Sequence, residues 1–440
     1  MVVVGGGIAG LSAAHRLREV APELEIVLLE QSDRLGGKIH TEPFAGQPVE
    51  AGAETFLLRE AGAESRALDL ARRVGLGDDL IHPAPVNAAL AIDGELRPLP
   101  GGTLMGIPAE PGALHGVASV ALTDTDNGRP LLDSEQDVTV GALVRQRLGD
   151  EVVERLVDPL LGGVYAGRAD DLSLRATIPG LHHAARTEHT LLQAVRAAMR
   201  AAPRPSGAPV FASLPGGLSR LVGAVAERAA ATVQCGETVR SLERTATGWR
   251  VHGIEAGAVV LAVPAAPAAR LLSAVQDELN LPYASVALVT LALPPHTVLP
   301  ELSGFLVPAD QGFAVKAATF FTTKWPHLHG EAVILRASLG RHTQTEVLRH
   351  TDDALVALVR AELPRLLGAP LPEPRAARVT RWGGGLPQYG VGHVERVAAL
   401  RKRLPPSLAL AGAAYDGVGI AACVRSGEAA AEQVLAAVRG

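Results

Sequence analysis

The sequence predicts an α/β protein with a discontinuous Rossmann-like dinucleotide-binding domain, a mixed-sheet substrate domain and a helical lobe. Residues 2–30 have the order strand, glycine-rich turn, helix and strand that is typical of a dinucleotide-binding unit. Residues 408–438 contain an apolar strand, a turn and an alanine-rich helix. Between these ends, apolar residues recur at helical intervals within 101–209 and alternate in strand fashion at 285–293 and 333–338.

Composition indicates a globular chain of more than one domain. Its 440 residues exceed what one hydrophobic core usually supports, and 48% hydrophobic with 20% charged residues exclude a disordered chain. The formal net charge is −5 and aromatic residues make up only 3%, so neither electrostatics nor base stacking favours a nucleic-acid partner. Any anionic ligand must therefore be held by local positive groups.

Cysteine and histidine usage gives no sign of a disulfide scaffold or a metal site. Cys235 and Cys423 lie far apart without a paired motif, which also favours a reducing compartment. His182, His183 and His189 lie near one another, but no acidic or cysteine ligand accompanies them at metal-binding spacing. No metal is therefore expected.

Membrane insertion is not expected either. Residues 281–300 carry no charge, but their prolines leave only Tyr283–Leu293 uninterrupted, which as a helix would reach about half of the hydrocarbon core. That segment is predicted to be a buried strand. Residues 101–209 show no basic amphipathic stripe, so membrane contact is expected to be peripheral at most. Met1 is followed by no signal-peptide pattern, and a cytoplasmic location is predicted.

The first glycine-rich turn follows the apolar run Val2–Val4. Gly5 permits the tight turn, and Gly7 lets the backbone approach a pyrophosphate because glycine has no Cβ. Gly10 allows the following helix to lie close to the strand. The spacing therefore predicts nucleotide binding at this turn.

The helix after this turn, and the strand after that, supply two further binding groups. The helix begins at Ile8 and Ala9, where free N–H groups and the helix dipole favour phosphate. The strand Glu25–Leu29 is followed by Glu30, whose carboxylate is expected to accept hydrogen bonds from the adenosine ribose. The same carboxylate would repel a 2′-phosphate, which argues against NADP.

A second glycine pair comes soon after Glu30. The segment contains, in order, Arg34, Gly36, Gly37 and Lys38. It resembles the second signature of FAD-dependent amine oxidases, carotenoid desaturases and porphyrinogen oxidases. The resemblance implies FAD as the cofactor, with the glycine pair close to the pyrophosphate and ribityl chain. Lys38 stands where Arg is usual, so the positive charge is kept but the bidentate fork is lost.

The C-terminal segment supplies the other end of this resemblance. The expected cofactor contacts are Gly412, which ends the strand, and the turn residues Gly417, Val418, Gly419 and Ile420. In this superfamily the helix that follows points its N-terminus at the flavin end of FAD. An acidic residue usually follows the first glycine, whereas here Ala413 does. Asp416 or backbone groups are therefore expected to replace the ribityl contact.

These segments predict an FAD-binding domain that is discontinuous in sequence. Val239 resembles the residue whose backbone contacts adenine. Cys423 lacks the preceding Ser-Gly pair of covalent flavoenzymes, so non-covalent FAD is expected. The predicted parts are residues 1–80, 210–265 and 380–440 for the FAD-binding domain, 81–100 and 266–379 for the substrate domain, and 101–209 for the helical lobe.

Four further sequence motifs narrow the resemblance to a smaller group of enzymes. They are Pro159–Gly167, Lys324–His327, Leu386–Tyr389 and Tyr415–Ile420. Their order and spacing are similar to those of the oxygen-dependent coproporphyrinogen III and protoporphyrinogen IX oxidases of haem biosynthesis. The resemblance implies three two-electron oxidations of a porphyrinogen, with O2 as acceptor and no catalytic group beyond the flavin. The composition favours coproporphyrinogen III only slightly, and the oligomeric state stays open.

The propionates of a porphyrinogen require local cations, and four residues are candidates. These are Arg97, Arg175, Lys316 and Lys324. Each can equally be an ordinary solvated charge. Tyr389 can line the flavin face or serve in packing.

Two other functions stay open from the sequence. One is an amine oxidase or a carotenoid desaturase that shares the flavin domain, although the few aromatic residues make an aromatic cage for amines harder to build. The other is a nucleotide-binding assembly factor without redox activity. Retention of flavin by the purified protein would count against the latter.

Overall fold

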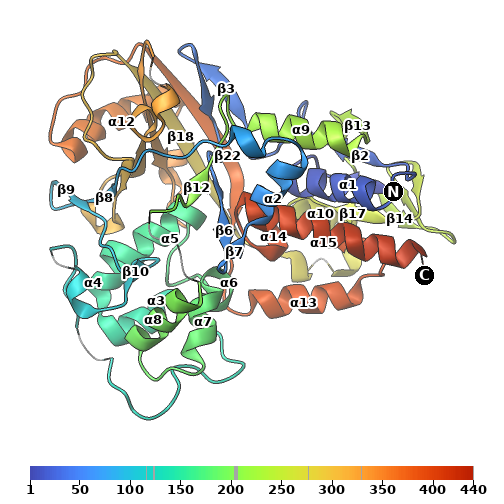
Figure 1. The fold of residues 1–440 in the computed structure, drawn as a ribbon, viewed down its shortest axis with the longest axis horizontal. Coiled ribbons are helices and arrows are strands. Elements are labelled where there is room, and N and C mark those ends of the chain that lie inside the picture. Colours follow the sequence, from blue (N-terminus) through green and yellow to red (C-terminus); the bar gives the residue numbers. More distant parts are fainter. Residues whose placement is uncertain (115, 122–123, 203–206, 276, 329, 440) are drawn as a thin grey trace.

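The computed structural model describes residues 1–114, 116–121, 124–202, 207–275, 277–328 and 330–439. Figure 1 shows a sheet with long helices at the end of the molecule that holds both termini, a second sheet, and a group of short helices below that second sheet. This arrangement confirms the predicted α/β fold class, with its mixed-sheet part and helical lobe.

A five-stranded parallel sheet joins the two ends of the chain (Figure 1). Its order is β13 (Thr232–Cys235), β2 (Val27–Glu30), β1 (Val2–Val4), β17 (Val259–Leu261) and β23 (Leu408–Leu410). The central β1 pairs with β2 and β17, and β17 pairs with β23. Three remote segments therefore form one sheet, as the sequence predicts.

Helices α1 (Ile8–Val20) and α15 (Ile420–Arg439) pack against this sheet and against each other. Leu11 and Leu17 on α1 are fully buried in the shared core. The helices are in close contact at Gly427, where a Cβ would lie 2.1 Å from the Ala9 carbonyl oxygen. The first and last helices of the chain are therefore in direct contact.

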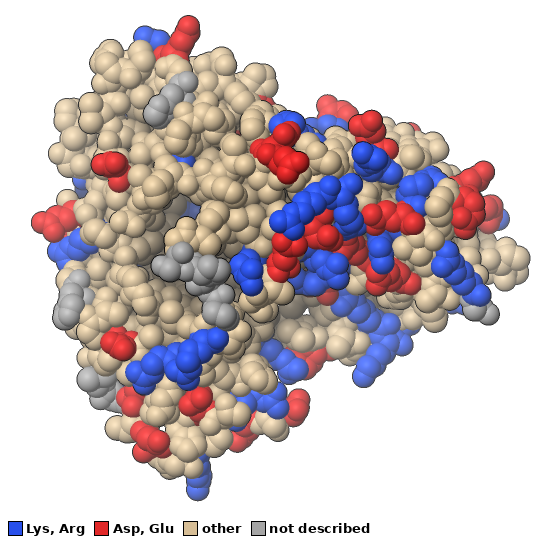
Figure 2. Space-filling model, viewed as in Figure 1, with Lys and Arg blue, Asp and Glu red and all other residues tan. Residues whose placement is uncertain are grey.

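Charged side chains hold α2 (Arg66–Arg73) against these two helices. Arg73 pairs with Glu428 on α15, with Glu19 on α1 at 2.6 Å and with Asp69 at 3.1 Å. Figure 2 shows acidic and basic side chains interleaved over this end of the molecule, whereas the other half of the same face carries fewer charges. The Glu428 side chain is only 9% exposed, whereas those of Glu19 and Asp69 are 30% and 41% exposed. The two more exposed pairs contribute only about 0–1 kcal/mol each, so we assign them to orientation more than to stability.

A seven-stranded mixed sheet forms the second domain. Its order is β22 (Ala376–Pro387), β18 (Tyr283–Leu293), β21 (Val333–Leu339), β20 (Val315–Phe320), β19 (Gly304–Leu306), β8 (Ala88–Ile92) and β9 (Glu95–Pro98). Only the β19–β8 neighbours are parallel among its described strands. β18 is buried over most of its length, which confirms the prediction of a buried strand there. The helix α12 (Asp352–Leu367) packs against this sheet.

Two details of this sheet concern its turns and its bounds. The Asp93-Gly94 turn joins β8 to β9, and both residues have positive φ, 53° and 80°, as a tight hairpin requires. β22 pairs with β18 as far as Pro387, so the boundary predicted at residue 380 falls inside a strand. We propose that the FAD-binding domain resumes after Pro387 instead.

Short helices form the lobe beside the seven-stranded sheet (Figure 1). They are α3 (Val140–Leu148), α4 (Asp150–Val152), α5 (Asp158–Tyr165), α6 (Leu174–Thr177), α7 (Pro179–Ala185) and α8 (Leu191–Ala201). The π-helical residues Val153–Val157 connect α4 to α5 without a break, and Pro159, the second residue of α5, has no N–H to donate. Within the described residues, every helix is too short or too polar to cross a bilayer.

Candidate active site

The first glycine-rich loop lies between β1 and α1 and has two kinds of glycine. Gly5 has φ +106°, and a Cβ there would lie 2.4 Å from the Ala262 carbonyl oxygen. A Cβ at Gly10 would lie 1.9 Å from the Gly5 carbonyl oxygen. A Cβ at Gly7, by contrast, would meet nothing within 4 Å. Close packing therefore requires the outer two glycines, whereas Gly7 leaves open space at the start of α1.

This open space suits the pyrophosphate of a dinucleotide. Gly7 is the N-cap of α1, and no side chain caps the helix there. The N-terminal N–H groups at Ile8 and Ala9 are therefore available for an anion, with the positive end of the helix dipole behind them. The geometry fits the cofactor that the sequence predicts.

The second glycine pair lies directly on the first loop. The Gly36 N–H donates to the Gly6 carbonyl oxygen at 2.8 Å, and a Cβ at Gly37 would lie 3.3 Å from the Gly7 Cα. The Arg34 guanidinium donates to carbonyl groups of its own loop, including that of Gly37 at 2.8 Å. Arg34 therefore holds the loop in shape, and its contact with the cofactor stays a prediction.

Glu30 connects three segments of the site. It is buried at the end of β2, where its carboxylate accepts the Gly6 N–H at 2.6 Å and both the N–H and the hydroxyl of Ser32 at 2.8 Å. Its carbonyl oxygen accepts the Glu237 N–H at 2.9 Å, which ties down the segment that contains the half-buried Val239. Glu30 and Val239 are thus brought to the same edge of the sheet. Their ribose and adenine contacts stay predictions.

Lys38 links the second loop to the C-terminal helix. Its side chain is solvent-accessible, yet desolvation by the surrounding protein lowers the pKa of its ammonium. Cys423, near the start of α15, interacts electrostatically with it. Burial raises the pKa of Cys423 to about 11, so this residue is a protonated thiol at neutral pH. A cation thus lies near the first turn of α15, where an anionic part of a cofactor would be stabilised.

The turn before α15 is the third glycine-containing segment that meets at the site. Gly412, Gly417 and Gly419 all have φ between 112° and 115°, a conformation that favours glycine. A Cβ at Gly412 would lie 3.6 Å from the Ala9 Cβ, which puts this turn against the start of α1. Val418 packs on the core of the helical lobe, whereas Ile420 joins the core of the five-stranded sheet.

Asp416 is held inside the protein by its neighbours. Arg401 donates to both of its carboxylate oxygens, at 2.9 and 2.6 Å, and the Ser426 hydroxyl donates to it as well. Ser426 also accepts the Gly412 N–H at 2.8 Å. Of the two expected replacements for the ribityl contact, this pairing favours backbone groups over Asp416.

Tyr389 is a packing residue. It is 1% exposed, its hydroxyl donates to the Ala413 carbonyl oxygen, and its ring centroid lies 4.5 Å from that of His393. The Tyr165 ring meets it edge-on at 5.7 Å. Burial lowers the pKa of His393 to about 4, so this stacked pair is uncharged. Tyr389 therefore supports the Gly412 turn from inside the protein.

Three of the four predicted substrate cations are paired elsewhere. Lys324 pairs with Glu54, and Arg175 pairs with Glu395. Arg97 donates to a backbone carbonyl of the lobe and lies near Glu95. The structure does not bring these cations together.

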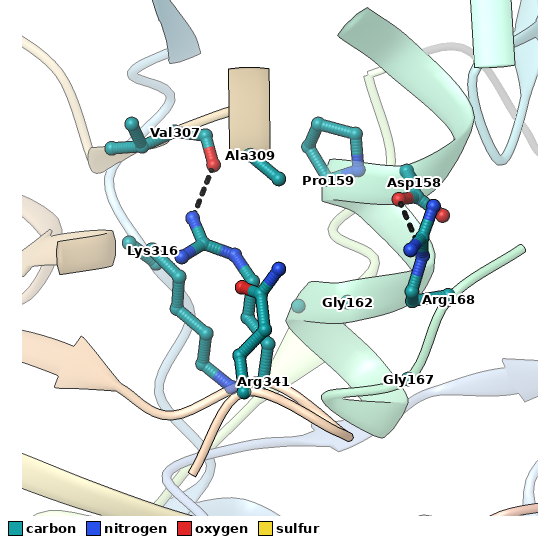
Figure 3. A pocket seen from close by; sticks show the side chains of 12 residues that line it. Asp158, Pro159, Gly162, Gly167, Arg168, Val307, Ala309, Lys316 and Arg341 are labelled. Carbon is teal, nitrogen blue, oxygen red and sulfur yellow. Dashed lines mark hydrogen bonds and ion pairs between the residues drawn. The ribbon is translucent and has the colours of Figure 1, made fainter. Parts of the chain in front are cut away.

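Lys316 is the fourth predicted cation, and it has a different environment. It is 9% exposed, burial lowers its pKa to about 7, and it lines a pocket between α5 and the seven-stranded sheet (Figure 3). Arg341 and Arg168 line the same pocket. Sequence reasoning missed Arg341 because no local motif marks it. Only the antiparallel register, with Val315 opposite Leu339, brings it beside Lys316.

The turn before α9 (Ser219–Ala229) was also not predicted from the sequence. Gly217 has φ +91° and approaches Thr41, where a Cβ would lie 2.2 Å from the side chain. The Thr41 N–H and hydroxyl form hydrogen bonds with Ser219 at 2.9 and 3.0 Å. The pair Gly216-Gly217 directly before a helix was the signal that could have revealed it.

Glu50, at the end of β4 (Gln47–Glu50), is anchored to the same turn. Its buried carboxylate accepts the Leu218 N–H at 2.6 Å and the Thr41 hydroxyl at 3.0 Å. Burial raises the pKa of Glu50 to about 7, although both hydrogen bonds act in the opposite direction.

We expect Glu50→Gln to change how stability depends on pH. Because the folded pKa is raised above the unfolded value, the wild-type protein loses stability as pH rises through about 7. The neutral amide avoids this loss and still accepts the Leu218 N–H. Urea unfolding should show the variant gaining on the order of 2 kcal/mol over wild type between pH 5 and pH 8. An equal difference at both pH values would contradict the assignment.

Comparison with known proteins identifies the family. The model for flavin containing amine oxidoreductases matches residues 8–435. A coproporphyrinogen III oxidase of Mycobacterium tuberculosis is 38% identical, over 99% of this chain and 97% of the relative. A human protoporphyrinogen oxidase is 30% identical, over 99% of this chain and 98% of the relative. A solved structure from Exiguobacterium sp. 255-15 is 32% identical, covers 98% of each chain and has a TM-score of 0.87.

The similarity and the geometry agree on the cofactor. The matched residues 8–435 include the second glycine pair and the Gly412–Ile420 turn, and the first glycine loop lies directly before them. The start of α1 and the turn before α15, at opposite ends of the chain, lie against each other. The chain belongs to the flavin containing amine oxidoreductase family and is an FAD-dependent oxidoreductase.

Proposed function

We propose that this enzyme oxidises a porphyrinogen to the porphyrin in haem biosynthesis, with coproporphyrinogen III as the preferred substrate and O2 as the acceptor. The single observation that carries the proposal is the convergence of the Gly7 loop, the Gly36-Gly37 loop and the Gly412–Ile420 turn. Full-length similarity to coproporphyrinogen III oxidases supports the substrate class.

When bound, FAD supplies the hydride acceptor, and the residues of the chain hold the cofactor and exclude water. The free N–H groups at the start of α1 would bind the pyrophosphate, and Gly7 would give it room. Lys38 would add a positive charge for the phosphates. Tyr389 and Val418, which pack on the helical lobe, would help to exclude water from the flavin end.

The alternatives have weaker support. An aromatic cage for amines is harder to build when aromatic residues make up only 3% of the chain, and Tyr165 and Tyr389 are themselves buried. A non-catalytic assembly factor would not need the cationic pocket that Lys316 and Arg341 line. We infer a cytoplasmic location from the two free cysteines, since thiols persist in a reducing compartment.

The proposal is tested by assaying the purified, flavin-loaded protein with coproporphyrinogen III and protoporphyrinogen IX in air. Porphyrin fluorescence and peroxide release are followed together. We expect both substrates to be oxidised, a higher kcat/KM for coproporphyrinogen III, and about three peroxide molecules per porphyrin because three electron pairs are removed. Turnover of simple amines with neither porphyrinogen oxidised would refute the proposal.

A further inference from the structure

A small cavity lies between the helical lobe and the seven-stranded sheet, lined from both sides by charged residues and glycines (Figure 3). It encloses about 100 Å³, and its lining includes Asp158, Gly162, Arg168, Lys316, Arg341 and Gln344. Cavities that hold whole cofactors or drug-sized ligands are roughly 300–1,000 Å³. This cavity therefore suits one side arm of a ligand better than a complete macrocycle.

Lys316 is a buried lysine. It is 9% exposed, and within the described residues its amino group has neither a hydrogen bond nor an ion pair. Burial and the neighbouring Arg341 both lower its pKa, to about 7. Figure 3 shows the two side chains on the same side of the cavity, opposite α5. A buried lysine next to an arginine is unfavourable unless an anion joins them.

The acidic groups near this pair have other partners. Asp158 accepts the Ala169 N–H at 2.5 Å and lies 4.0 Å from Arg168. Glu362 accepts the N–H groups of residues 314 and 315 at 3.0 and 2.8 Å. Arg341 is fixed by donation to the Val307 carbonyl oxygen at 3.0 Å. Asp158 and Glu362 also interact electrostatically with Arg341. Lys316, by contrast, has no acidic counter-ion among the described residues.

The opposite wall keeps two glycines where packing does not require them. A Cβ at Gly162 would lie 3.6 Å from the Gly167 carbonyl oxygen, and one at Gly163 would lie 3.5 Å from Leu306, both ordinary contacts. Each glycine inside a helix costs about 1 kcal/mol relative to alanine. The two glycines are explained if the space in front of α5 must stay open for a ligand.

The cavity is close to the proposed flavin end. The His342 N–H donates to the Ala166 carbonyl oxygen at 2.6 Å, so the segment after Arg341 is fastened to the end of α5. Gln388 also contacts the end of α5, where its side-chain amide donates to the Tyr165 carbonyl oxygen at 2.8 Å. The adjacent Tyr389 donates to the Ala413 carbonyl oxygen. A short series of direct contacts thus connects the cavity to the turn that precedes α15.

We propose that Lys316 and Arg341 form a carboxylate subsite that receives one propionate arm of the tetrapyrrole. This inference rests on the proposed function, because only a substrate with carboxylate arms near the flavin would use it. The ammonium and guanidinium together bind a carboxylate by charge-assisted hydrogen bonds. Gly162 and Gly163 leave the space through which the arm reaches them.

The first test is Lys316→Met in the flavin-loaded enzyme, with Lys402→Met as the matched control. Lys402 is another of the four lysines and is exposed on α13 (His393–Arg403). We expect Lys316→Met to raise KM for coproporphyrinogen III by about tenfold or more, because a charged hydrogen bond is lost. Flavin content should not change, Lys316→Arg should restore much of the affinity, and Lys402→Met should match wild type.

Two further measurements make the result decisive. Gly162→Leu fills the cavity from the α5 side, opposite Lys316 and Arg341, and should also raise KM, even if Lys316→Met folds poorly. Binding of coproporphyrin III and of its tetramethyl ester, followed by porphyrin fluorescence, separates carboxylate recognition from general damage. Lys316→Met should weaken binding of the acid and spare the ester.

An unchanged KM in both variants, or equal weakening for the acid and the ester, would overturn the subsite. Competition by phosphate or acetate with no difference between acid and ester would show a site for free anions instead. Failure of the proposed function would look different, because the wild-type enzyme itself would then neither oxidise coproporphyrinogen III nor bind coproporphyrin III.

Discussion

Gly10→Ala should prevent stable folding, whereas Gly7→Ala should fold and lose its FAD. A Cβ at Gly10 would lie 1.9 Å from a backbone oxygen of the strand-to-helix turn, so strand and helix must separate. We expect destabilisation by more than about 3 kcal/mol. A Cβ at Gly7 would meet no protein atom within 4 Å, so only the space for the pyrophosphate is lost.

This pair of variants is its own control, since the same methyl group is added three residues apart. Flavin absorbance of the purified proteins, thermal unfolding and circular dichroism distinguish the two outcomes. Gly7→Ala should be colourless, with the secondary structure of the wild type and the melting temperature of the apoprotein. If Gly7→Ala retained FAD with wild-type affinity, the placement of the pyrophosphate at this loop would be wrong.

Glu54→Gln should destabilise the enzyme by about 3 kcal/mol, because it leaves two partly buried cations without their counter-charge. Glu54 pairs with Lys324 and, at 2.7 Å, with Arg336, and all three side chains are less than one-fifth exposed. Burial alone would raise the pKa of Glu54, but Lys324 and Arg336 lower it. This contribution is therefore present above the unfolded pKa and is lost as pH falls through the folded one.

The double variant Glu54→Gln with Lys324→Met is the control. Removing both charges should recover part of the lost free energy of unfolding in urea titrations. KM for the porphyrinogen should be unchanged in Lys324→Met, because Lys324 pairs inside the protein. A KM increase as large as that of Lys316→Met would instead return Lys324 to the substrate site.

The cofactor side of the molecule could be predicted because its signals are local. Gly5, Gly7 and Gly10 lie within six residues of one another, and Glu30 ends the next strand, so spacing alone indicates their environment. The C-terminal strand, turn and helix are equally compact in sequence. Their meeting with the N-terminal sheet was predicted from the resemblance to FAD-dependent oxidoreductases, not from spacing.

The substrate side could not be predicted in the same way. Lys324 and its partner Glu54 are 270 positions apart, and Arg175 is 220 positions from Glu395. A sequence shows four cations, but whether each is paired depends on such remote contacts. Arg341 joins Lys316 only through the register of β20 and β21. The sequence shows which residues are charged, but only the tertiary structure shows which of them form ion pairs.

The most direct test of the central claim is anaerobic mixing of the flavin-loaded protein with coproporphyrinogen III. The account predicts that the visible flavin absorbance disappears as porphyrin fluorescence rises, and that admitting air restores the flavin. A flavin that stays oxidised while the porphyrinogen is in excess would contradict it, as would a purified protein that binds no flavin at all.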